Sequence, residues 1–261
     1  MKAMLHILRA RMRGEAALAI LFFLSLSAYA FIFFRFLLQG SLRGAAIALL
    51  YLLITLFLPL SEHLLRIRIP TVCYALLFFL CFGSLLGSTF NFYFRFPYWD
   101  TALHLLSGIL FAYIGYLIGL RIFPSGDTKG RWPYVFTGIL FSLSVALLWE
   151  LFEAGATAVM LVDMQEDTLL HTVKSFYLSG THDHPLILTG ITETVIHYGD
   201  GQIFRIPGYL DLGLTDTLSD MAVCLLGNLA FLLLFPLDKC FRGRLLPFVL
   251  PSAVKKSAKA P

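Results

Sequence analysis

The chain has 261 residues, of which 58% are hydrophobic and 14% are charged, whereas a soluble domain is typically about half apolar and about a quarter charged. This composition argues against a soluble protein and favours one that crosses a membrane several times. The net charge of +4 comes from basic residues in short segments between apolar runs, a distribution typical of membrane topology signals and not of a nucleic-acid-binding surface.

Six apolar segments are long enough to cross a bilayer, for which a helix needs about 20 residues. They are residues 15–38, 42–61, 70–92, 99–120, 133–160 and 213–235. Proline is tolerated in the first turn of a helix, so Pro70 and Pro133 are expected to open helices, and Pro236 is expected to follow the last one. The sequence predicts an all-α polytopic membrane protein, a single membrane domain over residues 1–261 with about six transmembrane helices.

The first apolar segment has two interpretations. A basic start followed by an apolar run that ends in Ala28-Tyr29-Ala30 is typical of a cleaved secretion signal. The apolar run continues to about residue 38, however, which favours an uncleaved first span. A cleaved signal followed by five spans is the alternative, and in both cases the next segment emerges outside the cell.

The distribution of lysine and arginine predicts the orientation. With a cytoplasmic N-terminus and six spans, 15 of the 20 Lys and Arg residues lie inside, as the positive-inside rule requires. The other five lie outside or at outer helix ends: Arg35, Arg43, Arg95, Lys174 and Arg205. We therefore expect both termini in the cytoplasm, with residues 239–261 as a basic cytoplasmic tail.

The long connection at residues 161–212 is predicted to be an extracytoplasmic loop that forms a structured cap, since long loops in compact proteins often carry function. Leu169, Leu170, Val173, Phe176 and Tyr177 follow the spacing of one face of a short helix at the membrane surface. Residues 192–206 instead indicate two strands around Gly199-Asp200-Gly201, a hairpin signal.

Three of the predicted spans carry ionisable residues in pairs. Residues three or four apart share a helix face, and the alternating direction of the spans places the three pairs at similar depth near the outer surface. Ionised groups are costly in a bilayer unless they face each other, water or a metal, so we expect one polar site. Its candidate residues are Asp100, His104, Glu150, Glu153, Asp216 and Asp220.

This set of carboxylates and one imidazole suits a divalent metal ion. Oxygen ligands favour magnesium, calcium or manganese, and a histidine adds zinc and iron. The expected metal ligands are Asp100, His104, Glu150, Asp216 and Asp220. Without a metal, clustered carboxylates share protons and suit general acid–base chemistry. The alternative is that the polar groups only hold helices together.

Three stretches resemble a known family. Asp100, His104 and Gly108 match a D-x-x-x-H-x-x-x-G helix, Glu150 and Glu153 a second helix, and Asp216, Asp220 and Gly227 a last one. In these features the chain resembles the VanZ-like superfamily of bacterial membrane proteins, particularly its YjdF-like branch. Many members carry asparagine where this chain has Cys224.

The resemblance implies a multi-pass protein of the bacterial cytoplasmic membrane. With an outer-facing pocket, the expected function is to bind or act on a cell-envelope lipid or lipid-linked precursor, by metal-assisted hydrolysis or transfer if the protein is an enzyme. The expected partners are membrane lipid and that substrate, with no nucleic acid. The alternative is a non-catalytic transporter or structural membrane protein.

Overall fold

A computed structural model describes residues 15–56, 59–60, 62, 64, 69–123, 131–161 and 163–242. Its helices are α2 Ala16–Leu38, α3 Leu42–Thr55, α5 Thr71–Phe90, α6 Phe92–Arg95, α7 Trp99–Ile122, α8 Trp132–Met160, α9 Phe176–Ser179 and α10 Leu214–Cys240. Its strands are β1 Asp167–Leu170, β2 Thr172–Ser175, β3 Leu186–Thr189, β4 Thr194–Tyr198, β5 Gln202–Ile206 and β6 Tyr209–Leu212. The chain is mostly helical, which confirms the predicted fold class.

Five of the described helices are long and apolar enough to span a membrane: α2, α5, α7, α8 and α10. The segment predicted as another span, residues 42–61, forms the shorter α3, whose 14 residues rise only about 21 Å. That is less than the roughly 30 Å of a bilayer's hydrocarbon core. The end of the predicted span falls partly outside the described residues.

Two features predicted from the sequence can be compared with the structure: the alternative cleavage motif in the first apolar segment, and the end of the last span. Helix α2 runs without interruption through Ala28–Ala30, so the alternative cleavage motif lies inside a regular helix. Pro236 does not end the last span, because α10 continues past it to Cys240. Proline lacks a backbone N–H and removes a helical hydrogen bond, but here it only marks the final turns. Residues 243–261 of the predicted basic tail lie outside the described residues.

The structure divides into two compact units. One contains Met1–Ala146 and Val223–Pro261, and the other contains Leu147–Ala222. Helices α8 and α10 each contribute to both units. The first unit therefore holds most of the apolar helices, and the second holds the six strands of the described residues.

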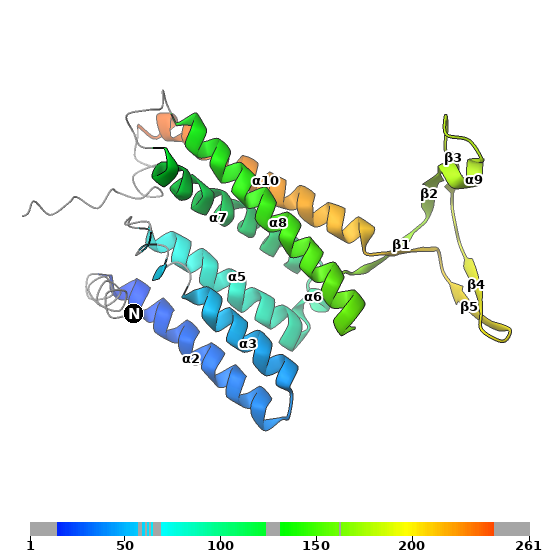
Figure 1. Ribbon diagram of the computed structural model, residues 1–261, viewed down its shortest axis with the longest axis horizontal. Helices are drawn as coiled ribbons and strands as arrows, with labels where there is room; N and C mark the ends of the chain where they lie inside the picture. Colours follow the sequence, from blue (N-terminus) through cyan, green and yellow to red (C-terminus); the bar gives the residue numbers. More distant parts are fainter. Residues whose placement is uncertain are drawn as a thin grey trace, which may run out of the picture. The chain divides into compact units, whose positions relative to one another are not determined.

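Within the first unit, α2 and α3 form a hairpin, with α5 packed along both (Figure 1). Ser41 caps α3 by accepting a hydrogen bond from the backbone N–H of Gly44 at 3.3 Å. At the other end, the Thr71 hydroxyl donates to the Glu15 carboxylate, which ties the start of α5 to the start of α2. The helices thus run in alternating directions, as the predicted topology requires.

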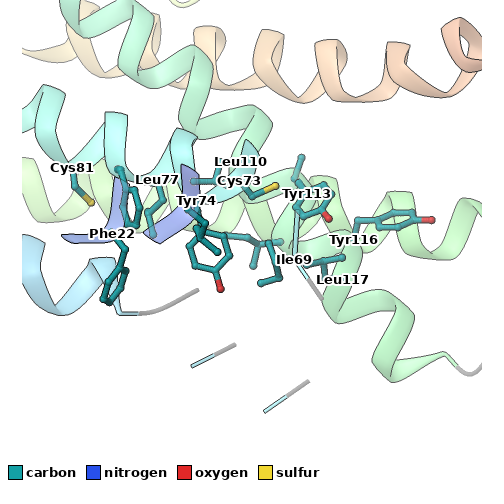
Figure 2. Close-up of a cluster of buried hydrophobic side chains, with 14 of the residues drawn as sticks. Phe22, Ile69, Cys73, Tyr74, Leu77, Cys81, Leu110, Tyr113, Tyr116 and Leu117 are labelled. Carbon is teal, nitrogen blue, oxygen red and sulfur yellow. The ribbon is translucent and has the colours of Figure 1, made fainter. Parts of the chain in front are cut away.

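A core of buried apolar side chains joins the helices of this unit. Figure 2 shows residues of α2, α5 and α7 that contribute to it, among them Phe22, Tyr74 and Tyr113. Large apolar side chains on the other faces of the same helices remain exposed, for example Leu24, Phe31 and Leu226. A soluble protein rarely exposes so much contiguous apolar surface, and a lipid-facing surface accounts for it.

The second unit contains three two-stranded antiparallel sheets, which pair β1 with β6, β2 with β3, and β4 with β5. The predicted hairpin around residues 199–201 is correct, with Gly199 and Gly201 at positive φ. The predicted surface helix over residues 169–177 is wrong. Most of that segment forms β1 and β2, and only the single turn α9 is helical. Pairing with the distant strands β6 and β3 overrides the local helical spacing.

Candidate functional site

Helix α8 carries two buried carboxylates on one face. Glu150 is 4% exposed and Glu153 is 7% exposed, and their spacing of three residues places them next to each other along the helix. Trp149 donates a hydrogen bond from its indole Nε1 to Oε1 of Glu153 at 2.8 Å. This bond helps to fix the orientation of the Glu153 side chain.

The start of α10 is held by a network of hydrogen bonds. The Asp211 carboxylate accepts a bond from the backbone N–H of Thr215 at 2.6 Å, as a helix cap does. The Asp216 carboxylate accepts from the backbone N–H of Glu166 at 3.0 Å. Gln165 donates to the Thr217 hydroxyl at 2.8 Å. These contacts attach the segment before β1 to the first turn of α10.

Asp220 completes a group of three buried carboxylates with Glu150 and Glu153. One oxygen from each lies within 4.8 Å of the others, and Asp220 is 5% exposed. All three residues belong to the second unit. Like charges this close together repel one another, and the spacing of the oxygens suits a divalent cation.

A second group of candidate residues, an aspartate and a histidine, lies at the start of α7. His104 Nε2 is 3.5 Å from Asp100 Oδ2, with the histidine buried and the aspartate partly exposed. Trp99 anchors this end of α7 by donating a hydrogen bond to the Gly83 carbonyl of α5 at 3.1 Å, and its ring packs against Phe92 and Phe96. The pair therefore sits on a fixed helix start within the first unit.

The six residues predicted from the sequence fall into three settings. Glu150, Glu153 and Asp220 form the carboxylate group, Asp100 and His104 form a pair on α7, and Asp216 holds the backbone of Glu166. Glu153, which the sequence placed outside the metal ligands, is a member of the carboxylate group. Asp216 has a clear structural task at the start of α10, although its predicted role as a ligand stays a prediction.

A family model described as "Predicted membrane protein (DUF2238)" matches residues 17–238. The chain belongs to this family. No curated protein matches the chain, and neither does any solved structure. Since the family description names no activity, the function of this DUF2238 protein has to be inferred from the chemistry of its site.

In this DUF2238 protein, glycines allow the backbone of α7 to lie in close contact with the backbones of α8 and α10. A Cβ atom on Gly108 would lie 2.3 Å from the Cys224 carbonyl of α10, and one on Gly227 would lie 2.3 Å from the Leu105 carbonyl of α7. On the other side of α7, a Cβ on Gly138 of α8 would lie 2.4 Å from the Ala112 carbonyl. Close backbone approach through small residues is a common way for membrane helices to pack.

Two neutral polar residues in these helices were missed by the sequence analysis. Ser142 on α8 and Asn228 on α10 are both 0% exposed. Any polar side chain inside an apolar span is a candidate site residue, whether or not it can ionise. An asparagine within the apolar run of residues 221–235 was the available signal.

Proposed function

We propose that this DUF2238 protein binds a divalent metal ion through Glu150, Glu153 and Asp220. The supporting observation is the group of three buried carboxylates whose oxygens lie within 4.8 Å of one another. Carboxylates buried this close together repel one another. A bound cation would offset that repulsion, and oxygen ligands of this kind hold magnesium, manganese and calcium ions in proteins.

Asp100 and His104 are proposed to contribute to the same site. The support is the sequence prediction, in which Asp100 and His104 share one face of α7 and belong to the same polar site as the carboxylates. A histidine ligand would extend the range of suitable metals to zinc and iron.

The proposed substrate is a cell-envelope lipid or lipid-linked precursor, acted on by hydrolysis or transfer at a phosphate or ester. Two points support it: the resemblance to VanZ-like proteins, and a polar site on helices that otherwise face lipid. A metal ion in such a site would polarise the phosphate or ester oxygen and lower the pKa of a bound water. Among the chain's own groups, the Trp149–Glu153 hydrogen bond would help to hold one carboxylate in place as a ligand.

Metal analysis of the purified protein tests this proposal. We expect the protein to retain a stoichiometric divalent metal after dialysis in metal-free buffer, measured by element-specific mass spectrometry. We also expect the chelator-treated protein to bind manganese again in a calorimetric titration. Protein that holds no metal as purified and takes up none at millimolar concentrations would contradict the proposal.

The proposed location of the site is the outer side of the bacterial cytoplasmic membrane, with both termini inside. Exposed Asp183 and Asp200 lie in the loop between α8 and α10, and Asp183→Cys and Asp200→Cys should react with a membrane-impermeant maleimide on intact cells. Native Cys240, exposed at the end of α10, serves as the matched control and should react only after permeabilisation. The reverse pattern would place the loop in the cytoplasm.

A further inference from the structure

A cavity of about 260 Å³ lies in the first unit among α2, α3 and α5, and it is partly open at the surface. One water molecule takes up about 30 Å³ of liquid volume, so the cavity has room for a group of several non-hydrogen atoms. Pockets that enclose a whole drug-sized ligand measure about 300–1,000 Å³. The cavity is therefore sized for part of a larger molecule, the rest of which lies outside it.

The lining of the cavity has an apolar part and a polar part. Three apolar side chains and three hydroxyl groups form most of it: Phe36, Ile47 and Leu85, and Ser41, Ser88 and Thr89. The Ser88 hydroxyl donates to the Ser84 carbonyl at 3.1 Å, and a hydroxyl oxygen that donates in this way can still accept a hydrogen bond. The cavity thus suits a ligand that is apolar at one end and polar at the other.

The hydroxyl groups lie at helix ends. Helix α5 has 20 residues, which rise about 30 Å, the thickness of a bilayer's hydrocarbon core. Its last turn, which contains Ser88 and Thr89, therefore lies near the boundary between the acyl chains and the headgroups. Ser41 lies in the turn that joins α2 to α3, and Leu38 and Leu42 on either side of it are exposed. Membrane lipids place their ester oxygens at this boundary and their chains on its apolar side.

The charges carried by these helices are positive. Arg35 is exposed in the last turn of α2, and Arg43 lies in the first turn of α3, and each directly precedes a residue that lines the cavity. Residues 16–61 and 63–99, which contain α2, α3, α5 and α6, include no aspartate or glutamate. Basic pockets between membrane helices bind anionic headgroups. The charge therefore favours an anionic lipid over a zwitterionic one.

We propose that this cavity binds an anionic phospholipid. The first part of one acyl chain packs against the apolar lining, and the ester and glycerol oxygens lie at the hydroxyl groups. The phosphate stays outside the cavity, where the positive charge of Arg35 and Arg43 attracts it. This site is distinct from the proposed metal site, because its lining residues belong to the first unit and the three carboxylates belong to the second.

Photo-crosslinking with a lipid tests this site. The full chain in detergent is illuminated with a phosphatidylglycerol that carries a diazirine near the start of one acyl chain, and peptide mass spectrometry locates the label. We expect Ile47 and Leu85 to be labelled more strongly than Leu140, which is exposed on α8 and reports unspecific contact. Unlabelled phosphatidylglycerol should suppress this excess at a concentration roughly 30-fold lower than phosphatidylcholine, as expected for two arginines near the headgroup.

Ser88→Phe tests whether the cavity holds the lipid. The larger side chain occupies part of the cavity, so the excess labelling of Ile47 and Leu85 should disappear. Ser144→Phe is the matched control. Both serines are exposed and donate to the carbonyl four residues earlier, but Ser144 lies on α8, so its replacement should leave the labelling unchanged.

A pair of charge variants tests the preference for anionic lipid. Arg35→Gln combined with Arg43→Gln should remove most of the roughly 30-fold difference between the two competing lipids. Arg121→Gln combined with Arg131→Gln removes two exposed arginines at the end of α7 and just before α8 and should leave that difference unchanged. Should Ser88→Phe fail to fold, this pair of variants decides.

Several results would overturn the proposal. These are labelling of Ile47 and Leu85 no stronger than that of Leu140, equal suppression by the two lipids, or full labelling in a folded Ser88→Phe variant. Suppression by inorganic phosphate as effective as that by phosphatidylglycerol would assign the site to a free anion. A dimer on size-exclusion chromatography that becomes a monomer in Ser88→Phe would assign it to a second copy of the chain.

The labelling does not depend on the proposed metal site. Chelator treatment should leave the excess labelling of Ile47 and Leu85 unchanged. A protein that binds metal but shows no excess labelling retains its proposed function and loses the lipid site. The two proposals therefore fail by different measurements.

Discussion

Gly108→Ala is expected to destabilise the protein strongly. The added methyl group would lie 2.3 Å from the Cys224 carbonyl oxygen, and a main-chain atom inside a helix cannot move aside as a flexible side chain can. Overpacking in a well-packed core typically costs about 1–3 kcal/mol, and we expect the upper end of that range here. For a chain of this size, about 3 kcal/mol corresponds to a fall in Tm of roughly 6–12 °C, which thermal unfolding in detergent can measure.

Gly155→Ala provides the matched control. Gly155 also lies in a membrane-spanning helix, α8, but no atom of the described residues outside its own stretch of helix lies within 4 Å of a Cβ atom built on it. Alanine is favoured over glycine within helices by roughly 0.5–1 kcal/mol, so this variant should be as stable as the wild type or slightly more stable. Equal losses of Tm in Gly108→Ala and Gly155→Ala would show that α7 and α10 do not depend on backbone contact at Gly108.

The helices could be predicted from the sequence because membrane spans carry their signal locally. An apolar run of about 20 residues identifies a span without reference to any other part of the chain, and five predicted spans agree with long apolar helices. Pro236 misled the prediction at the end of α10, because proline near the last turns of a helix removes only one hydrogen bond. The bounds of α10 therefore extend to Cys240.

The strands between α8 and α10 were harder to predict, since their pairing is not local. Leu169 and Val173 fit one face of a helix by spacing, yet Leu169 pairs with Leu210 and Val173 pairs with Leu188. No periodicity within residues 167–177 reveals partners that distant. The hairpin of β4 and β5 was predictable because its turn contains Gly199 and Gly201 directly between the paired strands.

The candidate site was only partly accessible to sequence reasoning. Helical spacing correctly placed Glu150 beside Glu153 on one face of α8, and Asp100 beside His104 on α7. Spacing alone could not distinguish Asp216 from Asp220, which share a face of α10 although only Asp220 joins the carboxylates of α8. Asp216 instead accepts a hydrogen bond from the backbone N–H of Glu166, a contact that only a three-dimensional structure can reveal.

Asp220→Asn is expected to remove most of the proposed metal binding. The substitution preserves the shape of the side chain but replaces an anionic ligand with a neutral amide, so the cation loses one of its three buried counter-charges. We expect manganese to bind at least about 100-fold more weakly, equivalent to roughly 2.8 kcal/mol. Calorimetric titration of the chelator-treated variant measures this change, with size-exclusion chromatography as the check on folding.

His104→Ala tests whether the pair on α7 belongs to the same site. If His104 is a ligand, its loss should weaken the binding of zinc more than that of manganese, because imidazole favours zinc and carboxylates favour manganese. Unchanged affinity for both metals would restrict the metal site to α8 and α10. Because the measurement compares the affinities for zinc and manganese, a general loss of folded protein would not change their ratio.

Asp216→Asn is the control that separates metal binding from structural support. An asparagine oxygen can still accept the hydrogen bond that Asp216 receives from the Glu166 N–H at 3.0 Å, so this variant should keep nearly the wild-type affinity for manganese. If Asp220→Asn instead binds manganese normally and the main effect of both variants is lost expression, the polar residues serve only to hold helices together. A weaker affinity in Asp220→Asn alone, in a folded protein, requires that the buried carboxylates hold the cation.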